Sequence, residues 1–191
     1  ASTFYCSGWK ESSILTVDGV GEWATTSWGV GRDNKIDLSG EIRFPHSLGL
    51  LYSAFTWYLG FKVNSAEYKV MGLAPYGEPL YVDRIRKLIH IAPDGTFRLD
   101  MRYFTFDHGM RMFNAGFEEV MGAPTRPLEK APLEQFHKDV ARSLQEVVND
   151  VMVALVTKVV EETGVPRICL AGGVALNCVA NGEILRRAPV E

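Results

Sequence analysis

Two glycine-rich segments of this chain carry the residue types that bind phosphate-bearing ligands through the backbone. The first spans residues 18–22 (D-G-V-G-E) and contains Asp18, Gly19 and Gly21, and the second spans residues 172–177 (G-G-V-A-L-N). Glycine lets the main chain come close to a phosphate and adopt positive φ angles. It also leaves amide N–H groups uncovered, so that they can point at an anion. The chemistry predicted for both segments is therefore anion binding by backbone amides.

The first segment partly matches a dinucleotide-binding fingerprint. Gly19, Gly21 and Ala24 fit the pattern G-x-G-x-x-A. That fingerprint works only where a helix starts after the glycines, because the pyrophosphate lies on the helix N-terminus. Residues 22–30 are rich in Trp and Thr and predict a strand instead, so we reject the fingerprint. On this segment alone, a tight hairpin turning at Asp18-Gly19 is the simpler interpretation.

The second segment is predicted to lie between a strand and a helix. Gly172 and Gly173 follow a short apolar strand at residues 167–171, and residues 174–187 predict a helix. A helix N-terminus offers unpaired N–H groups and a partial positive charge. Asn177, placed one turn into this helix, could hydrogen-bond a ribose or a base. The alternative is that the two glycines have a structural role alone, in which they allow a sharp turn and close packing of the helix on the strand.

The predicted elements around these segments give an α/β fold. Alternating and apolar runs predict three antiparallel strands in a meander, at residues 13–17, 22–30 and 35–44. Helical spacing of apolar residues predicts further helices at residues 47–58, 66–71 (capped by Ser65), 80–91 and 133–163, with a short strand at 96–99. Residues 102–132 are irregular and rich in aromatic side chains, and we expect them to be partly helical. Because it is irregular and rich in aromatic side chains, this segment is a candidate for contacts with an acceptor substrate.

Composition excludes several classes of protein. Of 191 residues, 47% are hydrophobic, and 20 basic against 23 acidic side chains give a net charge of −3. These values exclude a disordered chain and argue against nucleic-acid binding. No apolar run reaches the roughly 18 residues that cross a membrane. Cys6, Cys169 and Cys178 form no Cys-x-x-Cys pair, which favours a reduced, cytoplasmic protein, and Cys178 is expected to be a small buried thiol.

Four motifs together resemble one known family. They are P-H-S-L-G at residues 45–49, E-Y-K-V-M-G-L-A-P-Y-G at 67–77, and the glycine-containing stretches 14–26 and 169–182. In their order along the chain they resemble the nodulation and antibiotic O-carbamoyltransferases. The match covers most of the chain, and only residues 102–132 match loosely. The two glycine segments also resemble the phosphate-facing loops of the actin-like ATPase fold, where two lobes each supply a hairpin or a Gly-Gly turn around one nucleotide.

The resemblance implies a fold and a reaction. The fold would be an incomplete actin-like ATPase (ribonuclease H-like) domain, similar to the tRNA threonylcarbamoyl-transferring enzymes, with a mixed sheet, an antiparallel meander and flanking helices. The reaction would use ATP and carbamoyl phosphate to form carbamoyl-adenylate and pyrophosphate. The carbamoyl group would then pass to a hydroxyl of a sugar, nodulation factor or antibiotic-like acceptor, near a bound divalent metal such as iron. A YrdC-like domain would follow in the same chain, and an oligomer is possible.

The resemblance also implies roles for individual residues, all of them in ligand binding. Asp18, Gly19 and Gly21 would line the nucleotide or carbamoyl-adenylate site, and Gly172, Gly173 and Asn177 would bind the adenosine side. Glu67 would bind the ribose hydroxyls, Lys69 fills the basic position of the motif, and Tyr76-Gly77 would close over the adenosine. For Lys69, a solvated ion partner is the alternative. No catalytic residue is assigned.

Some family features are expected outside residues 1–191. The metal histidines belong to an H-x-x-x-H motif expected before Ala1, and a metal-binding Asp is expected after Glu191. His46, His90, His108 and His137 show no paired spacing, and His137 is expected at the surface. We therefore predict that residues 1–191 are the central part of one domain, without a metal site and inactive alone.

Two other functions stay open at this stage. One is a kinase or ATPase of the same fold, for which Asp18 is the only obvious catalytic aspartate. The other is a nucleotide-binding module without catalysis.

Overall fold

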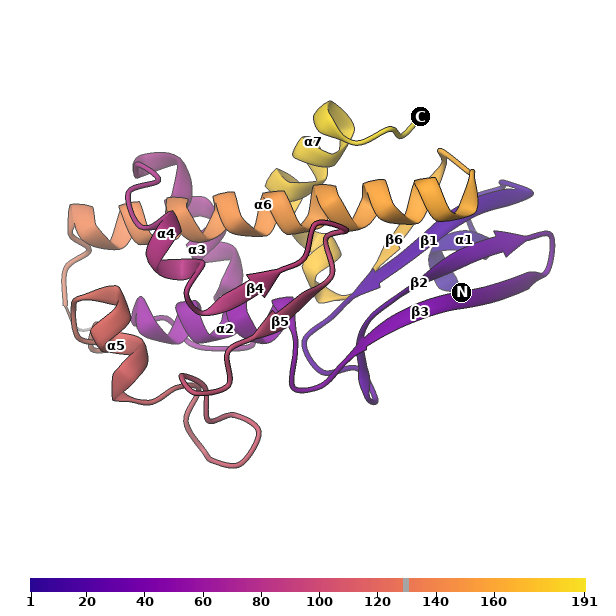
Figure 1. Ribbon diagram of the computed structural model, residues 1–191. Helices are drawn as coiled ribbons and strands as arrows, with labels where there is room; N and C mark the ends of the chain where they lie inside the picture. The colour runs from indigo at the N-terminus through magenta and orange to yellow at the C-terminus, as the bar shows by residue number, and fades with distance from the viewer. Residues whose placement is uncertain (129–130) are drawn as a thin grey trace. The chain divides into compact units, whose positions relative to one another are not determined.

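The computed structural model describes residues 1–128 and 131–191. Its backbone divides into two compact units. The first, which we call the sheet unit, comprises Ala1–Gly49, Ile91–Phe97 and Asn149–Glu191. The second, which we call the helical unit, comprises Leu50–His90 and Arg98–Val148. Figure 1 labels the elements of both units.

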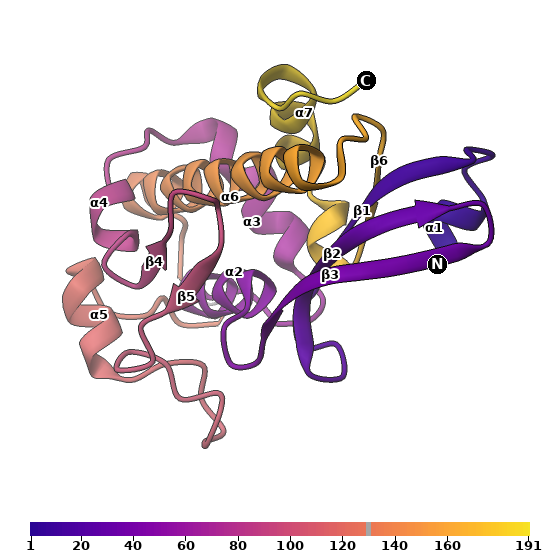
Figure 2. The ribbon, with the colours of Figure 1, turned by 45° about the vertical axis from the view of Figure 1, so that its right-hand side comes forward.

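The sheet unit is built on four strands in the order β3-β2-β1-β6. They are β1 (Glu11–Val17), β2 (Ala24–Arg32), β3 (Lys35–Arg43) and β6 (Ile168–Ala171). The first three form the predicted antiparallel meander, and β6 lies parallel to β1 with Leu15 opposite Leu170. Figures 1 and 2 show the three long strands side by side and the shorter β6 next to β1. The predicted mixed sheet is thus confirmed.

Strand β1 lies between β2 and β6, and most of its residues are buried on both faces of the sheet. On one face, Ile14 packs with Cys169 and with Phe4 of helix α1 (Ser2–Tyr5). A Cβ on Gly31 of β2 would lie 2.6 Å from the Phe4 ring, so glycine makes room for that ring. On the other face, the hydroxyl groups of Ser13 and of Thr163 in helix α6 (Gln135–Thr163) are 2.6 Å apart.

The segment after β6 differs from the prediction. A 3₁₀ turn, η2 (Gly173–Leu176), comes first, and helix α7 (Cys178–Arg187) begins only after it. The helix predicted at residues 174–187 is therefore too long at its N-terminus. The reason is Asn177, whose backbone is extended and whose side chain accepts a hydrogen bond from the Ala180 N–H at 3.0 Å. Asn177 thus caps the helix instead of lying inside it.

The helical unit packs around a cluster of aromatic rings. It contains most of α2 (Leu48–Tyr58), α3 (Glu67–Leu73), the 3₁₀ turn η1 (Ala74–Tyr76), α4 (Val82–Ile85), α5 (Ala115–Met121) and the first half of α6. Phe117 of α5 stacks on Phe113 with ring centroids 4.2 Å apart and meets Phe55 and Tyr58 edge-on or tilted. The helices predicted at residues 47–58, 66–71 and 133–163 are confirmed, with small shifts at their ends.

Two local predictions in this part of the chain are wrong. Residues 80–91 are helical only over α4, and Ile89–Ile91 form strand β4, which pairs with β5 (Phe97–Leu99). A turn at Asp94-Gly95, with Gly95 at φ +80°, and the β-branched isoleucines explain the hairpin. Ser65 does not cap α3, because Ala66 is the cap residue and has no side-chain hydrogen bond. Of residues 102–132, only α5 is helical among those described.

No helix in the described part of the chain is both long enough and apolar enough to span a membrane.

Phe117 is fully buried at the centre of the aromatic cluster, so its loss should be costly. We expect Phe117→Ala to lower the free energy of unfolding by about 3–5 kcal/mol, because it leaves a cavity among four rings. Leu185→Ala, at an exposed position of α7, should change it by less than about 0.5 kcal/mol. Urea denaturation followed by circular dichroism measures both, and equal effects would contradict the assignment of Phe117 to the core.

Candidate functional site

The loop between β1 and β2 is longer than a tight hairpin turn. Strand β1 ends at Val17 and β2 begins at Ala24, so residues 18–23 form the connection and the two-residue turn at Asp18-Gly19 is wrong. The Asp18 N–H donates to the Thr25 carbonyl at 2.8 Å and closes the base of the loop. Gly21 has φ +59°, and a Cβ there would lie 2.4 Å from the Ala24 carbonyl oxygen. The backbone of this loop therefore requires glycine at position 21.

The Asp18 carboxylate joins the two glycine-rich segments. Its Oδ1 accepts hydrogen bonds from the Gly19 N–H at 2.8 Å and from the Gly173 N–H at 3.2 Å. Gly172, at φ +94°, is packed so closely that a Cβ would lie 2.2 Å from the Val17 carbonyl oxygen. This supports the interpretation that Gly172 allows a sharp turn and close packing. Both segments lie in the sheet unit, whereas the actin-like arrangement implied one from each lobe.

The loop also presents amides that the described residues leave without an acceptor. Among the described residues, none accepts a hydrogen bond from the backbone N–H of Val20, Gly21 or Glu22. Gly19 has open space on the side where a side chain would lie, because a Cβ there would find no atom within 4 Å. Packing thus explains Gly21 and Gly172 but not Gly19. The absence of a side chain at Gly19 leaves the backbone open to a ligand, as anion binding by amides requires.

The segment at residues 173–177 differs from the helix start that the sequence predicted. The Gly172-Gly173 pair opens a 3₁₀ turn and not the N-terminus of α7. Asn177 is 8% exposed, and its Oδ1 caps α7. Asn181 adds a contact that no sequence pattern indicated, since its Nδ2 donates to the Ala175 carbonyl at 2.8 Å. The placement of Asn177 one turn inside a helix is wrong, and its role toward a ligand stays a prediction.

The other four predicted ligand-binding residues belong to the helical unit. The Glu67 Oε1 accepts hydrogen bonds from the Ser53 hydroxyl at 3.0 Å and from the Asn64 N–H at 2.8 Å. This carboxylate thus already ties the loop before α3 to α2. The Lys69 Nζ lies 5.9 Å from the centroid of the Phe61 ring.

Tyr76 and Gly77 lie on a turn that is fixed to α6. A Cβ on Gly77 would lie 2.1 Å from the Lys138 carbonyl oxygen, so this glycine is required by packing. Next to it, the Glu78 N–H donates to the Asp139 Oδ1 at 2.8 Å. The Tyr76 side chain is 71% exposed on this anchored turn. It is therefore held at a defined place and is accessible to a ligand.

Two expectations about titratable groups need correction. Cys178 is exposed at the start of α7 and is not a buried thiol. His137 is partly buried, and burial, aided by the Arg126 guanidinium, lowers its pKa below the ordinary value. Within residues 1–128 and 131–191, no group of three or more His, Cys, Asp or Glu side chains could hold a metal ion.

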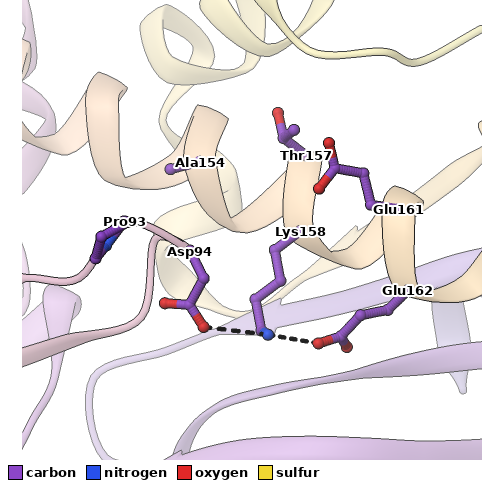
Figure 3. A pocket seen from close by; sticks show the side chains of 7 residues that line it. All are labelled: Pro93, Asp94, Ala154, Thr157, Lys158, Glu161 and Glu162. Atoms are coloured by element: carbon purple, nitrogen blue, oxygen red, sulfur yellow. Dashed lines mark hydrogen bonds and ion pairs between the residues drawn. The ribbon is translucent and has the colours of Figure 1, made fainter.

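A separate cavity of about 510 Å³ lies between the β4–β5 turn and the C-terminal half of α6 (Figure 3). The Lys158 Nζ lies 3.2 Å from the Asp94 Oδ2, contacts the Glu162 carboxylate, and lies 5.4 Å from the centroid of a Trp28 ring. The hydrogen bond from the Thr96 hydroxyl, aided by Lys158, lowers the pKa of Asp94. The Lys158 ammonium is thus already paired with two carboxylates. Its ion pair with Asp94 joins the β4–β5 turn to α6.

Comparison with known proteins identifies the family. A family model described as "Carbamoyltransferase N-terminus" matches residues 1–191. The chain belongs to the carbamoyltransferase family. The resemblance drawn from the four motifs is therefore confirmed.

Three relatives of this carbamoyltransferase chain match it along nearly its whole length. An uncharacterized protein of Synechocystis sp. is 56% identical over 97% of the chain and 30% of its own length. Nodulation protein NolNO of Sinorhizobium fredii is 36% identical over 97% of the chain and 25% of its own length. Nodulation protein NolO of Bradyrhizobium diazoefficiens is 35% identical over 96% of the chain and 31% of its own length. The carbamoyltransferase chain thus spans about a third or less of the length of these relatives.

The role of the Asp18 carboxylate in joining the two glycine-rich segments can be tested without any ligand. Asp18→Ala removes both hydrogen bonds to Oδ1, whereas Asp18→Asn keeps an oxygen that can accept them. We expect hydrogen exchange of the Gly173 amide to become faster in Asp18→Ala and to stay near the wild-type rate in Asp18→Asn. Nuclear magnetic resonance measures both rates, and equal protection in the alanine variant would exclude the link.

The pKa of Asp94 gives a prediction of pH dependence. Because this pKa is lower in the folded state, its stabilising contribution is complete above the ordinary value of ~4 and is lost as the pH falls through the folded value. Thr96→Val removes the hydroxyl that lowers the pKa of Asp94, so this pKa should rise toward its ordinary value. The part of the folding stability that Asp94 loses in acid should then be smaller. Carboxyl carbon titration measures the pKa. Thr157→Val, which changes a cavity residue that bonds the Val153 carbonyl, should leave the pKa of Asp94 unchanged.

Proposed function

We propose that this chain is the nucleotide-binding part of an ATP-dependent O-carbamoyltransferase. The enzyme would use carbamoyl phosphate, water and ATP to form carbamoyl-adenylate, with release of phosphate and pyrophosphate. The carbamoyl group would then pass to a hydroxyl of a sugar, nodulation factor or antibiotic-like acceptor, with AMP as the leaving group. One observation carries the proposal. In a chain of the carbamoyltransferase family, the Asp18 carboxylate brings the two glycine-rich segments together at the ends of β1 and β6.

The loop at residues 18–23 suits the phosphate part of such a nucleotide. The amides of Val20, Gly21 and Glu22 are available to phosphoryl oxygens, and the open backbone at Gly19 permits close approach. Hydrogen bonds from fixed backbone amides would hold the reacting phosphate in one orientation, which lowers the entropic part of the barrier. When ATP is bound, its phosphates supply the leaving group. The Asp18 carboxylate repels phosphate, so a cation would be expected to accompany the nucleotide here.

Residues of the helical unit have proposed roles on the adenosine side. The Glu67 carboxylate keeps an oxygen, Oε2, to which no described residue donates, and such an oxygen can accept from ribose hydroxyls. The exposed ring of Tyr76 offers a face for stacking. Lys69 and Gly77 are proposed from the family motif alone. Gly172, Gly173 and Asn177 have the same proposed role in the sheet unit.

The remaining features of the whole enzyme are also proposals. The antiparallel meander, with a parallel strand that ends in a Gly-Gly turn, supports an actin-like ATPase fold. A divalent metal, with iron as the expected ion, would polarise the carbamoyl carbonyl. Its ligands would come from outside the described residues, since these hold no suitable cluster. A YrdC-like domain in the same chain and a cytoplasmic location complete the proposal.

The proposal is tested on the full-length protein with ATP and isotopically labelled carbamoyl phosphate. We expect release of pyrophosphate that depends on carbamoyl phosphate, and transfer of label to a hydroxyl-bearing acceptor. Transfer of the γ-phosphate would instead indicate a kinase. Binding of ATP without any turnover would indicate a nucleotide-binding module.

A glycine variant links this activity to the loop. Gly19→Ala should fold normally, since its Cβ meets no atom, but should weaken ATP binding roughly tenfold, about 1.4 kcal/mol, by blocking the backbone. Gly182→Ala, within α7, is the matched control and should leave ATP affinity unchanged. Calorimetric titration measures both, and unchanged affinity in Gly19→Ala would place the phosphates elsewhere.

A further inference from the structure

The P-H-S-L-G motif at residues 45–49 lies directly beneath the loop at residues 18–23. It connects β3 to α2 and belongs to the sheet unit, as the loop does. The motif is fixed to the sheet by Thr25, whose hydroxyl donates to the carbonyls of Ile42 and His46 at 3.1 and 2.5 Å. No role toward a ligand followed from the sequence for these residues.

Ser47 makes the central contact between the motif and the loop. Its side chain is fully buried, and its Oγ donates to the Gly19 carbonyl at 2.5 Å and to the Asp18 carbonyl at 3.1 Å. A hydroxyl has a single hydrogen, so the two carbonyls share it. Both carbonyls must therefore point toward Ser47.

The first turn of α2 adds a steric limit beside this hydrogen bond. A Cβ on Gly49 would lie 2.7 Å from the Asp18 carbonyl oxygen and 2.8 Å from the Gly19 Cα. The loop backbone is thus packed directly on the helix backbone, with no side chain between them. Because interiors pack closely, the peptide groups at Asp18 and Gly19 have little room to rotate.

The direction of the Gly19 carbonyl decides the direction of the next amide. In a trans peptide the C=O and N–H bonds point in opposite directions within one plane. Because the Gly19 carbonyl points to Ser47, the Val20 N–H points away from Ser47, toward the outer side of the loop. This N–H is one of the amides to which no described residue offers an acceptor.

We propose that Ser47 is a positioning residue for phosphate binding. It holds the Gly19–Val20 peptide in the orientation that turns the Val20 N–H outward, toward a phosphoryl oxygen of the nucleotide. The inference rests on the proposed function, because it takes ATP as the ligand of this loop. It assigns to the P-H-S-L-G motif the task of fixing the loop before the ligand arrives, so that ordering the loop costs nothing on binding.

The experiment compares Ser47→Ala with a matched control in the full-length protein. Ser13→Ala is the control, because Ser13 is equally buried and its hydroxyl donates to the Val165 carbonyl at 2.7 Å, at the far end of β1. Each variant loses a buried hydroxyl and should lower the melting temperature. Calorimetry with ATP and with adenosine then separates the phosphates from the nucleoside. We expect Ser47→Ala to weaken ATP binding roughly tenfold and adenosine binding hardly at all. Ser13→Ala should change neither affinity.

The outcomes separate this inference from the proposed function. If the wild-type protein binds ATP and Ser47→Ala binds it as Ser13→Ala does, Ser47 has only a structural role and the inference is overturned. An equal loss of ATP and adenosine affinity in Ser47→Ala overturns it as well. If the wild-type protein does not bind ATP, the proposed function fails first and the inference fails with it. Should Ser47→Ala not fold, Ser47→Cys replaces the hydroxyl with a somewhat larger thiol that is a weaker donor, and wild-type ATP affinity in that variant overturns the inference.

Discussion

The parallel pairing of β6 with β1 is the constraint on which the candidate site depends. Strands that run in parallel end at the same edge of a sheet, so the segments that follow Val17 and Ala171 must emerge next to each other. Gly172 then turns so tightly that it touches the Val17 carbonyl, and the Asp18 carboxylate closes the remaining gap to Gly173. Strand order thus makes neighbours of segments that are more than 150 residues apart in sequence.

The glycines of these segments differ in what they do. Gly21 and Gly172 are required by positive φ angles and by backbone atoms that leave no space for a Cβ. Gly19 has no positive φ, and a Cβ there would meet no atom within 4 Å, so folding does not require glycine at this position. A sequence pattern cannot distinguish these glycines. The structure shows that Gly21 and Gly172 are needed for the backbone conformation, whereas Gly19 is not.

The strands and the long helix could be predicted because their signals are local. Residues 13–17 and 35–44 alternate or run apolar, and residues 133–163 repeat apolar side chains over many turns, so the pattern identifies each element. The errors arose where another interaction outweighed the pattern. Asn177 bonds back to the Ala180 amide and delays α7, and Ile89–Ile91 pair with β5 although their spacing also suits a helix. The support of Asp18-Gly19 by Ser47 joins residues far apart in sequence, and no local signal could predict it.

One tryptophan directly precedes β2 and another lies within it, and their surroundings are opposite. Trp23 is 73% exposed on the loop, whereas Trp28 is 7% exposed and donates from Nε1 to Glu162 at 2.8 Å. An indole in water emits at longer wavelengths and is quenched by acrylamide, whereas a buried indole is shielded. Together with Trp9 and Trp57, which are partly exposed, they form the four tryptophans of the chain. Trp23 therefore places an optical reporter on the loop, whose signal overlaps that of Trp9 and Trp57, and Trp28 is a shielded indole in the same sheet.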